Sequence, residues 1–179
     1  MVSRRENLEC PSVRKGASPH CPREAVLLLG SNQGRRVRRI RDAVDRLSRE
    51  TELLAVSRMY ASEPFGRSYQ PWFLNLAVRA ATGRSPWDLL ALAKRLEQEA
   101  GRCGGARWGP RSLDVDILLL GDSVIDVPGL VIPHASMAQR RFCLLPAADV
   151  APDTVVPTHG CTVTQLLNSC KDPLEVIVL

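Results

Sequence analysis

The stretch RWGPRSLDVDILLLG, residues 107–121, places two aspartates at the start of an apolar run. We expect residues 112–120 to form a strand. Side chains alternate along a strand, so Asp114 and Asp116 should share one face, with their Cα atoms roughly 6.6 Å apart. Two carboxylates at that spacing can share a pair of magnesium ions about 3.5–4 Å apart, together with substrate phosphates. The alternative reading is a strand end that carries two solvated acids.

An arginine-rich loop precedes this strand. Arg102 and Arg111 bracket it, and Gly104 and Gly105 make it pliable. Because one guanidinium group can bind two phosphate oxygens at once, we expect this loop to form a lid over a triphosphate. A solvated basic loop is the alternative, which Trp108 disfavours because an indole is poorly placed in solvent.

Upstream, strands and helices follow a recognisable order. Strands are expected at residues 25–31, 52–62 and 72–80, with a helix after the first and another after the third. The first helix buries Val37, Ile40, Val44 and Leu47. Ser85 caps the second and Gly101 ends it. With the strand at 112–120, this β-α-β-β-α-β order predicts an α+β fold with a ferredoxin-like core.

A C-terminal extension of short helices and strands follows this core. Residues 123–134 indicate a hairpin or an extended excursion, short helical stretches follow Ser136 and Thr162, and residues 174–179 suggest an edge strand. We expect one domain over residues 25–179. Residues 1–24 lack periodicity and are expected to be a disordered N-terminal extension.

The composition fits a globular protein of the cytoplasm. The chain has 179 residues, 45% of them hydrophobic, and a net charge of +5. No apolar run approaches the roughly 20 residues of a membrane span. The six cysteines show no zinc-site spacing, and reduced thiols are expected. The basic charge suits an anionic partner, or reflects codon bias.

Rival functions are disfavoured by specific absences. The segment LLLGSNQG lacks the GK[ST] of a phosphate loop. A polymerase-type nucleotidyltransferase needs its Gly-Ser turn close in sequence to the paired aspartates, but Gly30 is far from Asp114. The chain is short for a glycosyltransferase. A ferredoxin-like RNA binder would display aromatic residues on its strands, but only 4% of residues are aromatic.

A set of motifs in order resembles the 6-hydroxymethyl-7,8-dihydropterin pyrophosphokinase family of folate biosynthesis. These motifs are GSNQG, YASEPFG, QPWFLNLAV, LEQEAGR, RWGPRSLDVDILL and IPHASMAQRRFCLLPAADVAP, from about Val26 to Pro157. The resemblance implies a ferredoxin-like core. It also implies transfer of diphosphate from ATP to the pterin hydroxymethyl oxygen, which leaves AMP.

By position, the resemblance also implies roles for individual residues. The catalytic residues would be Arg102, Arg111, Asp114 and Asp116, and the two aspartates would bind two Mg²⁺ ions. The pterin site would comprise Ser62, Pro64, Phe65, Phe73, Asn75 and Phe142, with Phe73 and Phe142 sandwiching the ring. The ATP site would comprise Glu97, Trp108, Arg111, Ile117, His134 and Arg140. Lys94 departs from a glutamine found in some members.

The partners expected from the resemblance are small molecules. They are ATP and 6-hydroxymethyl-7,8-dihydropterin. No nucleic acid and no membrane are expected, and the protein is expected to act as a cytoplasmic monomer.

Overall fold

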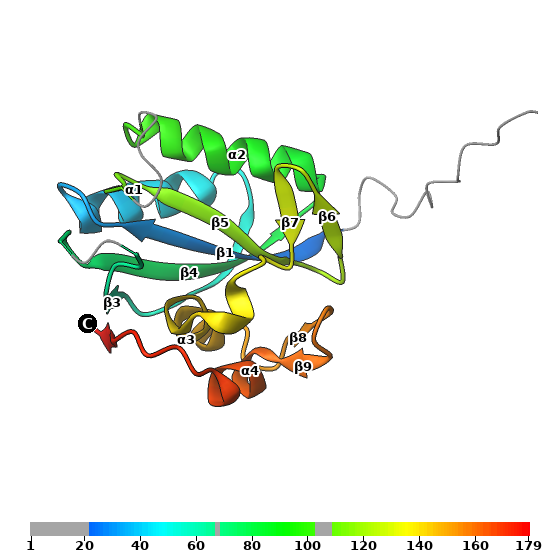
Figure 1. Cartoon of the computed structure of the whole chain (residues 1–179). Coiled ribbons are helices and arrows are strands. Elements are labelled where there is room, and N and C mark those ends of the chain that lie inside the picture. Colours follow the sequence, from blue (N-terminus) through cyan, green and yellow to red (C-terminus); the bar gives the residue numbers. More distant parts are fainter. Residues whose placement is uncertain (1–21, 67–68, 103–108) are drawn as a thin grey trace, which may run out of the picture.

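The computed structural model describes residues 22–66, 69–102 and 109–179 (Figure 1). In this part of the chain the strands are β1 (Arg23–Ser31), β2 (Glu52–Val56), β3 (Tyr60–Ser62), β4 (Phe73–Thr82), β5 (Asp114–Leu120), β6 (Ile125–Val127), β7 (Leu130–Ile132), β8 (Val155–Val156), β9 (Cys161–Thr162) and β10 (Val176–Val178). The helices are α1 (Arg36–Leu47), α2 (Pro86–Glu99), α3 (Arg141–Val150) and α4 (Val163–Ser169), with a 3-10 turn at Met137–Gln139.

The main sheet is antiparallel and has the strand order β10-β3-β4-β1-β5, with β2 also paired to β4. Helices α1 and α2 cover one face of the sheet, and α3 and α4 cover the other (Figure 1). The predicted α+β fold is confirmed, but the observed order from β1 to β5 is β-α-β-β-β-α-β, because the second predicted strand is divided in two.

Strand β1 lies inside the sheet, between β4 and β5, and is buried on both faces. Ala25, Leu27 and Leu29 pack under α1 and α2, whereas Val26 and Leu28 pack under α3 and α4. A strand covered on both sides needs apolar residues at every position, which explains the unbroken AVLLL run. The strand begins at Arg23, two residues before the expected start, because Arg23 and Glu24 still pair with β4.

The expected strand over residues 52–62 is wrong as a single element. It is divided into β2 and β3 by residues 57–59, which lie opposite only residues 76–77 of β4. The Ser57 amide donates to the Ala77 carbonyl, and the Ser57 hydroxyl accepts from the Ala77 amide, each at 2.9 Å. One extra residue against the partner strand is a bulge, and it bends the chain between β2 and β3.

The two helices of the core begin and end largely as predicted. The Ser85 hydroxyl accepts from the Asp88 amide at 3.1 Å, and Gly101, at φ +81°, follows the end of α2. The prediction for Val37 in α1 is wrong. Val37 lies in the first turn and is 40% exposed, because the buried face begins one turn later, at Ile40.

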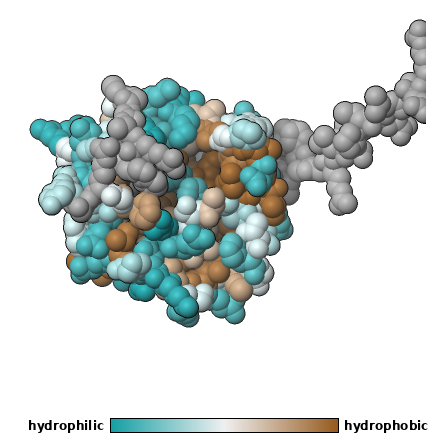
Figure 2. All heavy atoms as spheres, in the orientation of Figure 1, coloured by the Kyte–Doolittle hydropathy of each residue, from teal (hydrophilic) through white to brown (hydrophobic). Residues whose placement is uncertain are grey.

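The C-terminal extension follows the prediction in outline. Strands β6 and β7 form the expected hairpin, α4 follows a Thr162 capping box, and β10 adds an edge strand to β3. After Ser136 comes a longer helix than expected, because the 3-10 turn leads into the ten residues of α3. Figure 2 shows apolar residues gathered over the β6–β7 hairpin, where Val124, Val127 and Val131 are exposed.

No helix within the described ranges combines the length and the apolar character that crossing a membrane requires.

Candidate active site

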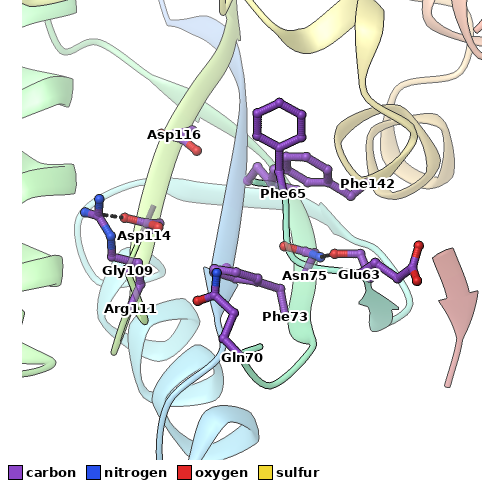
Figure 3. Close-up of a pocket in the computed structure, with 13 residues that line it drawn as sticks. Glu63, Phe65, Gln70, Phe73, Asn75, Gly109, Arg111, Asp114, Asp116 and Phe142 are labelled. Atoms are coloured by element: carbon purple, nitrogen blue, oxygen red, sulfur yellow. Dashed lines mark hydrogen bonds and ion pairs between the residues drawn. The ribbon is translucent and has the colours of Figure 1, made fainter. Parts of the chain in front are cut away.

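A pocket of about 210 Å³ opens on the face of the sheet that α3 covers (Figure 3). The register of the sheet explains how its walls meet. Gly30 of β1 pairs with Asn75 of β4 on one side and with Asp114 of β5 on the other. The lining residues are Leu28, Gly30, Ser62, Glu63, Phe65, Gln70, Phe73, Asn75, Gly109, Arg111, Asp114, Asp116 and Phe142.

The acidic wall is the predicted same-face pair. Asp114 and Asp116 both line the pocket, while Val115 between them points into the core on the opposite face. Burial raises the pKa of the Asp114 carboxyl, and the guanidinium of Arg102 opposes that rise. Burial likewise raises the pKa of Asp116, opposed by His134 and then Lys94. Two partly desolvated carboxylates at one pocket wall are a favourable setting for a cation.

Cationic side chains and Glu97 surround the start of β5. Arg102 Nη1 lies 2.7 Å from the Asp114 carboxylate and also pairs with Glu97, and Arg111 Nη1 lies 3.8 Å from Asp114. The Glu97 carboxylate is 3% exposed, and Lys94 Nζ donates to it at 3.0 Å. It also accepts the Val115 amide at 3.0 Å, so it fixes the backbone between the two aspartates.

The opposite wall of the pocket consists of aromatic side chains and the amide of Asn75. Phe65, Phe73 and Phe142 line the pocket, and Figure 3 shows Phe73 and Phe142 on either side of the Asn75 side chain. The Asn75 amide nitrogen donates to Ser62 Oγ at 2.8 Å, which fixes the direction of the amide. This wall can hold a flat ring by stacking and by hydrogen bonds to its edge.

Several predicted residues lie outside the lining of the pocket. Arg102 pairs with Asp114, which lines the pocket. The Arg140 guanidinium lies over the Phe65 ring, 3.7 Å from its centroid, and buried Ile117 packs in the core on the other face of the sheet. Nδ1 of His134 is buried without a hydrogen-bond partner among the described residues. Pro64 is half-buried beside Phe65, and Trp108 lies outside the described residues.

The sequence analysis missed several residues of the site. Glu63 and Gln70 line the pocket, and Gly30 leaves room for the Asn75 amide. Asn32 is 1% exposed; its Oδ1 accepts the Arg111 amide at 2.7 Å and its Nδ2 donates to Gln70 Oε1 at 3.0 Å. The available signal is the polar GSN immediately after an apolar strand, a stretch whose interpretations as a phosphate loop, a polymerase-type turn or a family motif assign no role to Asn32.

Comparison with known proteins places the chain in a family. Residues 26–152 match the family model for 7,8-dihydro-6-hydroxymethylpterin-pyrophosphokinase (HPPK). The chain belongs to the HPPK family. The resemblance drawn from the motifs is confirmed, and so is the activity that it implied: this HPPK is a diphosphotransferase that transfers diphosphate from ATP to hydroxymethyldihydropterin in folate synthesis.

Two curated relatives show how far the similarity extends. The chain is 44% identical over 151 residues to the 2-amino-4-hydroxy-6-hydroxymethyldihydropteridine pyrophosphokinase of Pseudomonas aeruginosa, covering 83% of this chain and 91% of the relative. It is 40% identical over 128 residues to the enzyme of the same name from Bacillus subtilis, covering 70% of this chain and 77% of that one.

Solved structures support the fold. A Plasmodium falciparum HPPK-DHPS structure with pteroate aligns at a TM-score of 0.65 and 17% identity. The alignment covers 83% of this chain and 42% of the other, so the HPPK described here spans less than half of that protein. At this identity the similarity confirms the α+β fold and nothing finer.

Proposed function

We propose that the pocket between β5 and α3 is where this HPPK brings its two substrates together. The pterin ring would lie at the Phe73, Asn75 and Phe142 wall, and the triphosphate of ATP at the Asp114 and Asp116 wall. The observation that carries this proposal is the register of Gly30, whose two neighbours across the sheet are Asn75 and Asp114. A ring-binding amide and a cation-binding carboxylate thus flank a single residue.

The donor set of the acidic wall fits magnesium. Asp114 and Asp116 offer carboxylate oxygens from one strand face, and burial disfavours their charge until a cation neutralises it. Mg²⁺ prefers a few carboxylates completed by phosphates and water. We therefore propose that these two residues hold the two Mg²⁺ ions expected with ATP. When bound, the ions would neutralise charge on the phosphate oxygens.

The remaining residues would align the reactants and balance charge. The pterin hydroxymethyl group loses its proton to solvent as its oxygen forms a bond to the β-phosphorus of ATP. The bond from that phosphorus to the oxygen shared with the α-phosphorus breaks, and AMP leaves with that oxygen. Arg102 and Arg111 lie at Asp114 and can turn to the phosphate oxygens, where guanidinium groups bind in pairs. Asn75, held by Ser62, would orient the ring so that its hydroxymethyl group faces the acidic wall.

Which residues bind the adenosine part of ATP stays a prediction. His134 is the candidate that the structure favours most, because its Nδ1 has no hydrogen-bond partner among the described residues and its ring lies near Asp116. The Arg140 guanidinium lies over the ring of Phe65, so Arg140 would contribute to ATP binding from the side of the pocket where the pterin lies. We also propose that the protein acts as a cytoplasmic monomer. Size-exclusion chromatography with light scattering tests the oligomeric state.

A single assay tests the proposed function. Purified protein is incubated with ATP, Mg²⁺ and 6-hydroxymethyl-7,8-dihydropterin, and the nucleotides are separated. The expected products are AMP and the pterin diphosphate in equal amounts, with no AMP when the pterin is omitted. Release of ADP, or AMP formation that does not depend on the pterin, would contradict the proposal.

A further inference from the structure

After α4 the C-terminal segment returns to the edge of the main sheet, next to β3. We refer to residues 170–179 as the C-terminal strap; they lie beyond the last residue matched to the family, 152. In Figure 1 the strap, which ends in β10, runs along the outer edge of the sheet beside β3. Val176 pairs with Ser62, and the Glu63 amide donates to the Glu175 carbonyl at 3.1 Å. The Glu63 carboxylate accepts the Glu175 amide at 2.9 Å in return.

The strap also carries a buried carboxylate. The side chain of Asp172 is 1% exposed. Its Oδ2 accepts the amide of Arg141, the first residue of α3, at 3.1 Å, and its Oδ1 accepts the Leu174 amide at 3.3 Å. Oδ1 also lies 4.0 Å from Nη1 of Arg140. At this position Asp172 gives the first amide of α3 an acceptor that the helix itself does not supply. Its negative charge also interacts favourably with the positive end of the helix dipole.

The partners of Asp172 lead directly to two aromatic residues of the pocket. The Arg140 guanidinium that faces Asp172 lies over the ring of Phe65 at 3.7 Å from its centroid. Phe142 follows Arg141 in the first turn of α3, so the position of that turn sets the position of its ring. Burial of a charged carboxylate is costly unless it has partners. The contacts with Arg140, Arg141 and Leu174 therefore stabilise the buried position of Asp172, and Asp172 in turn fixes these three residues.

We propose that Asp172 is a positioning residue for the pterin, an inference that rests on the proposed function. It fixes the start of α3, and hence Phe142, through the Arg141 amide, and it fixes Phe65 through the guanidinium of Arg140. The strap thereby supports the aromatic wall from outside residues 26–152, which match the family model. Asp172 itself does not line the pocket.

The test compares two changes at Asp172 with a matched control. Asp172→Asn keeps an acceptor for the Arg141 amide and removes the charge, whereas Asp172→Ala removes both. Asp153→Asn removes a charge from an exposed position in the same part of the chain. Pterin binding is measured by calorimetry in the presence of saturating Mg²⁺ and α,β-methylene-ATP, and binding of that analogue is measured alone.

We expect Asp172→Ala to weaken pterin binding about tenfold and Asp172→Asn by less, with analogue binding changed by under about twofold. Asp153→Asn should match the wild type. Unchanged pterin binding in Asp172→Ala, or an equal loss for both ligands, would overturn the positioning role. If the wild type itself binds no pterin, the proposed function fails, whereas normal wild-type binding with an unaffected variant removes only this inference.

Hydrogen exchange in the wild type gives a readout that does not depend on a variant. The amides of Arg141 and Leu174 both donate to Asp172. Saturating pterin, added to the complex with the ATP analogue, should slow exchange at both amides, because an occupied aromatic wall stabilises the contacts that hold it. Exchange that is unaffected by pterin at either amide would overturn the proposal.

Discussion

Replacing Gly30 with alanine should damage pterin binding through Asn75. A Cβ atom at Gly30 would lie 3.1 Å from Oδ1 of Asn75 and 3.9 Å from Cδ1 of Phe73. The first distance is a few tenths of an ångström short of ordinary contact. The backbone cannot retreat, because β1 pairs with β4 on one side and β5 on the other. The Asn75 amide must therefore shift, although its hydrogen bond to Ser62 holds it.

The size of the effect follows from this crowding. Adding one methyl group to a packed site costs about 1–3 kcal/mol. If roughly 1.4 kcal/mol of that cost appears in the complex, the pterin KM rises about tenfold. A further 1 kcal/mol of lost stability would lower the melting temperature by about 2–4 °C in a protein of this size. The KM for ATP should change little.

A double-mutant cycle isolates the cause. Asn75→Ala should raise the pterin KM by itself, and adding Gly30→Ala to it should then raise KM little further, because the atom that the methyl group displaces is gone. Steady-state assays of AMP release and thermal melts are made on all four proteins. Strictly additive effects in the cycle, or a Gly30→Ala enzyme with a normal pterin KM, would refute this reasoning.

Further predictions follow from the same contacts. Asp114→Asn and Asp116→Asn should each lower AMP release at least about 100-fold with unchanged circular dichroism, and near-normal turnover would argue against a cation role. Phe142→Ala should weaken pterin binding more than ATP-analogue binding in calorimetry; an equal loss would make Phe142 a core residue. Arg102→Ala should slow the transfer step in rapid-quench experiments with little change in analogue binding, and full turnover would contradict its role. The pKa of Asp149 is lowered chiefly by its hydrogen bond to Arg58, so the Asp149 carboxylate should stabilise the fold at pH values above the usual pKa of aspartate, by a small amount because Arg58 is exposed. The melting-temperature difference between wild type and Asp149→Asn should disappear as pH falls through that lowered pKa; a difference that persists would disprove the linkage.

The core of the fold could be predicted because its signals are local. The cap of α2 at Ser85 and its end at Gly101 depend on neighbours in sequence. The shared face of Asp114 and Asp116 follows from the period of a strand. The bulge at residues 57–59 could not be seen, because it is defined by the count of residues on the partner strand β4.

The supporting residues of the site depend on contacts between distant segments. Asn32 binds the Arg111 amide across 79 positions of the chain, and Asp172 binds the Arg141 amide across 31. Neither contact leaves a periodic pattern in the sequence. The motifs identified Asp114, Asp116, Asn75 and the three phenylalanines of the pocket, whereas Asn32 and Asp172, which hold neighbouring segments in place, emerge only from the packed structure.

A crystal structure of the complex with 6-hydroxymethyl-7,8-dihydropterin, α,β-methylene-ATP and Mn²⁺ in place of Mg²⁺ tests the central claim most directly. The pterin ring should lie between Phe73 and Phe142 with its edge bonded to the Asn75 side chain, and anomalous scattering from Mn²⁺ should appear at Asp114 and Asp116. A pterin bound away from Asn75, or manganese located away from both aspartates, would contradict the assignment of this pocket as the active site.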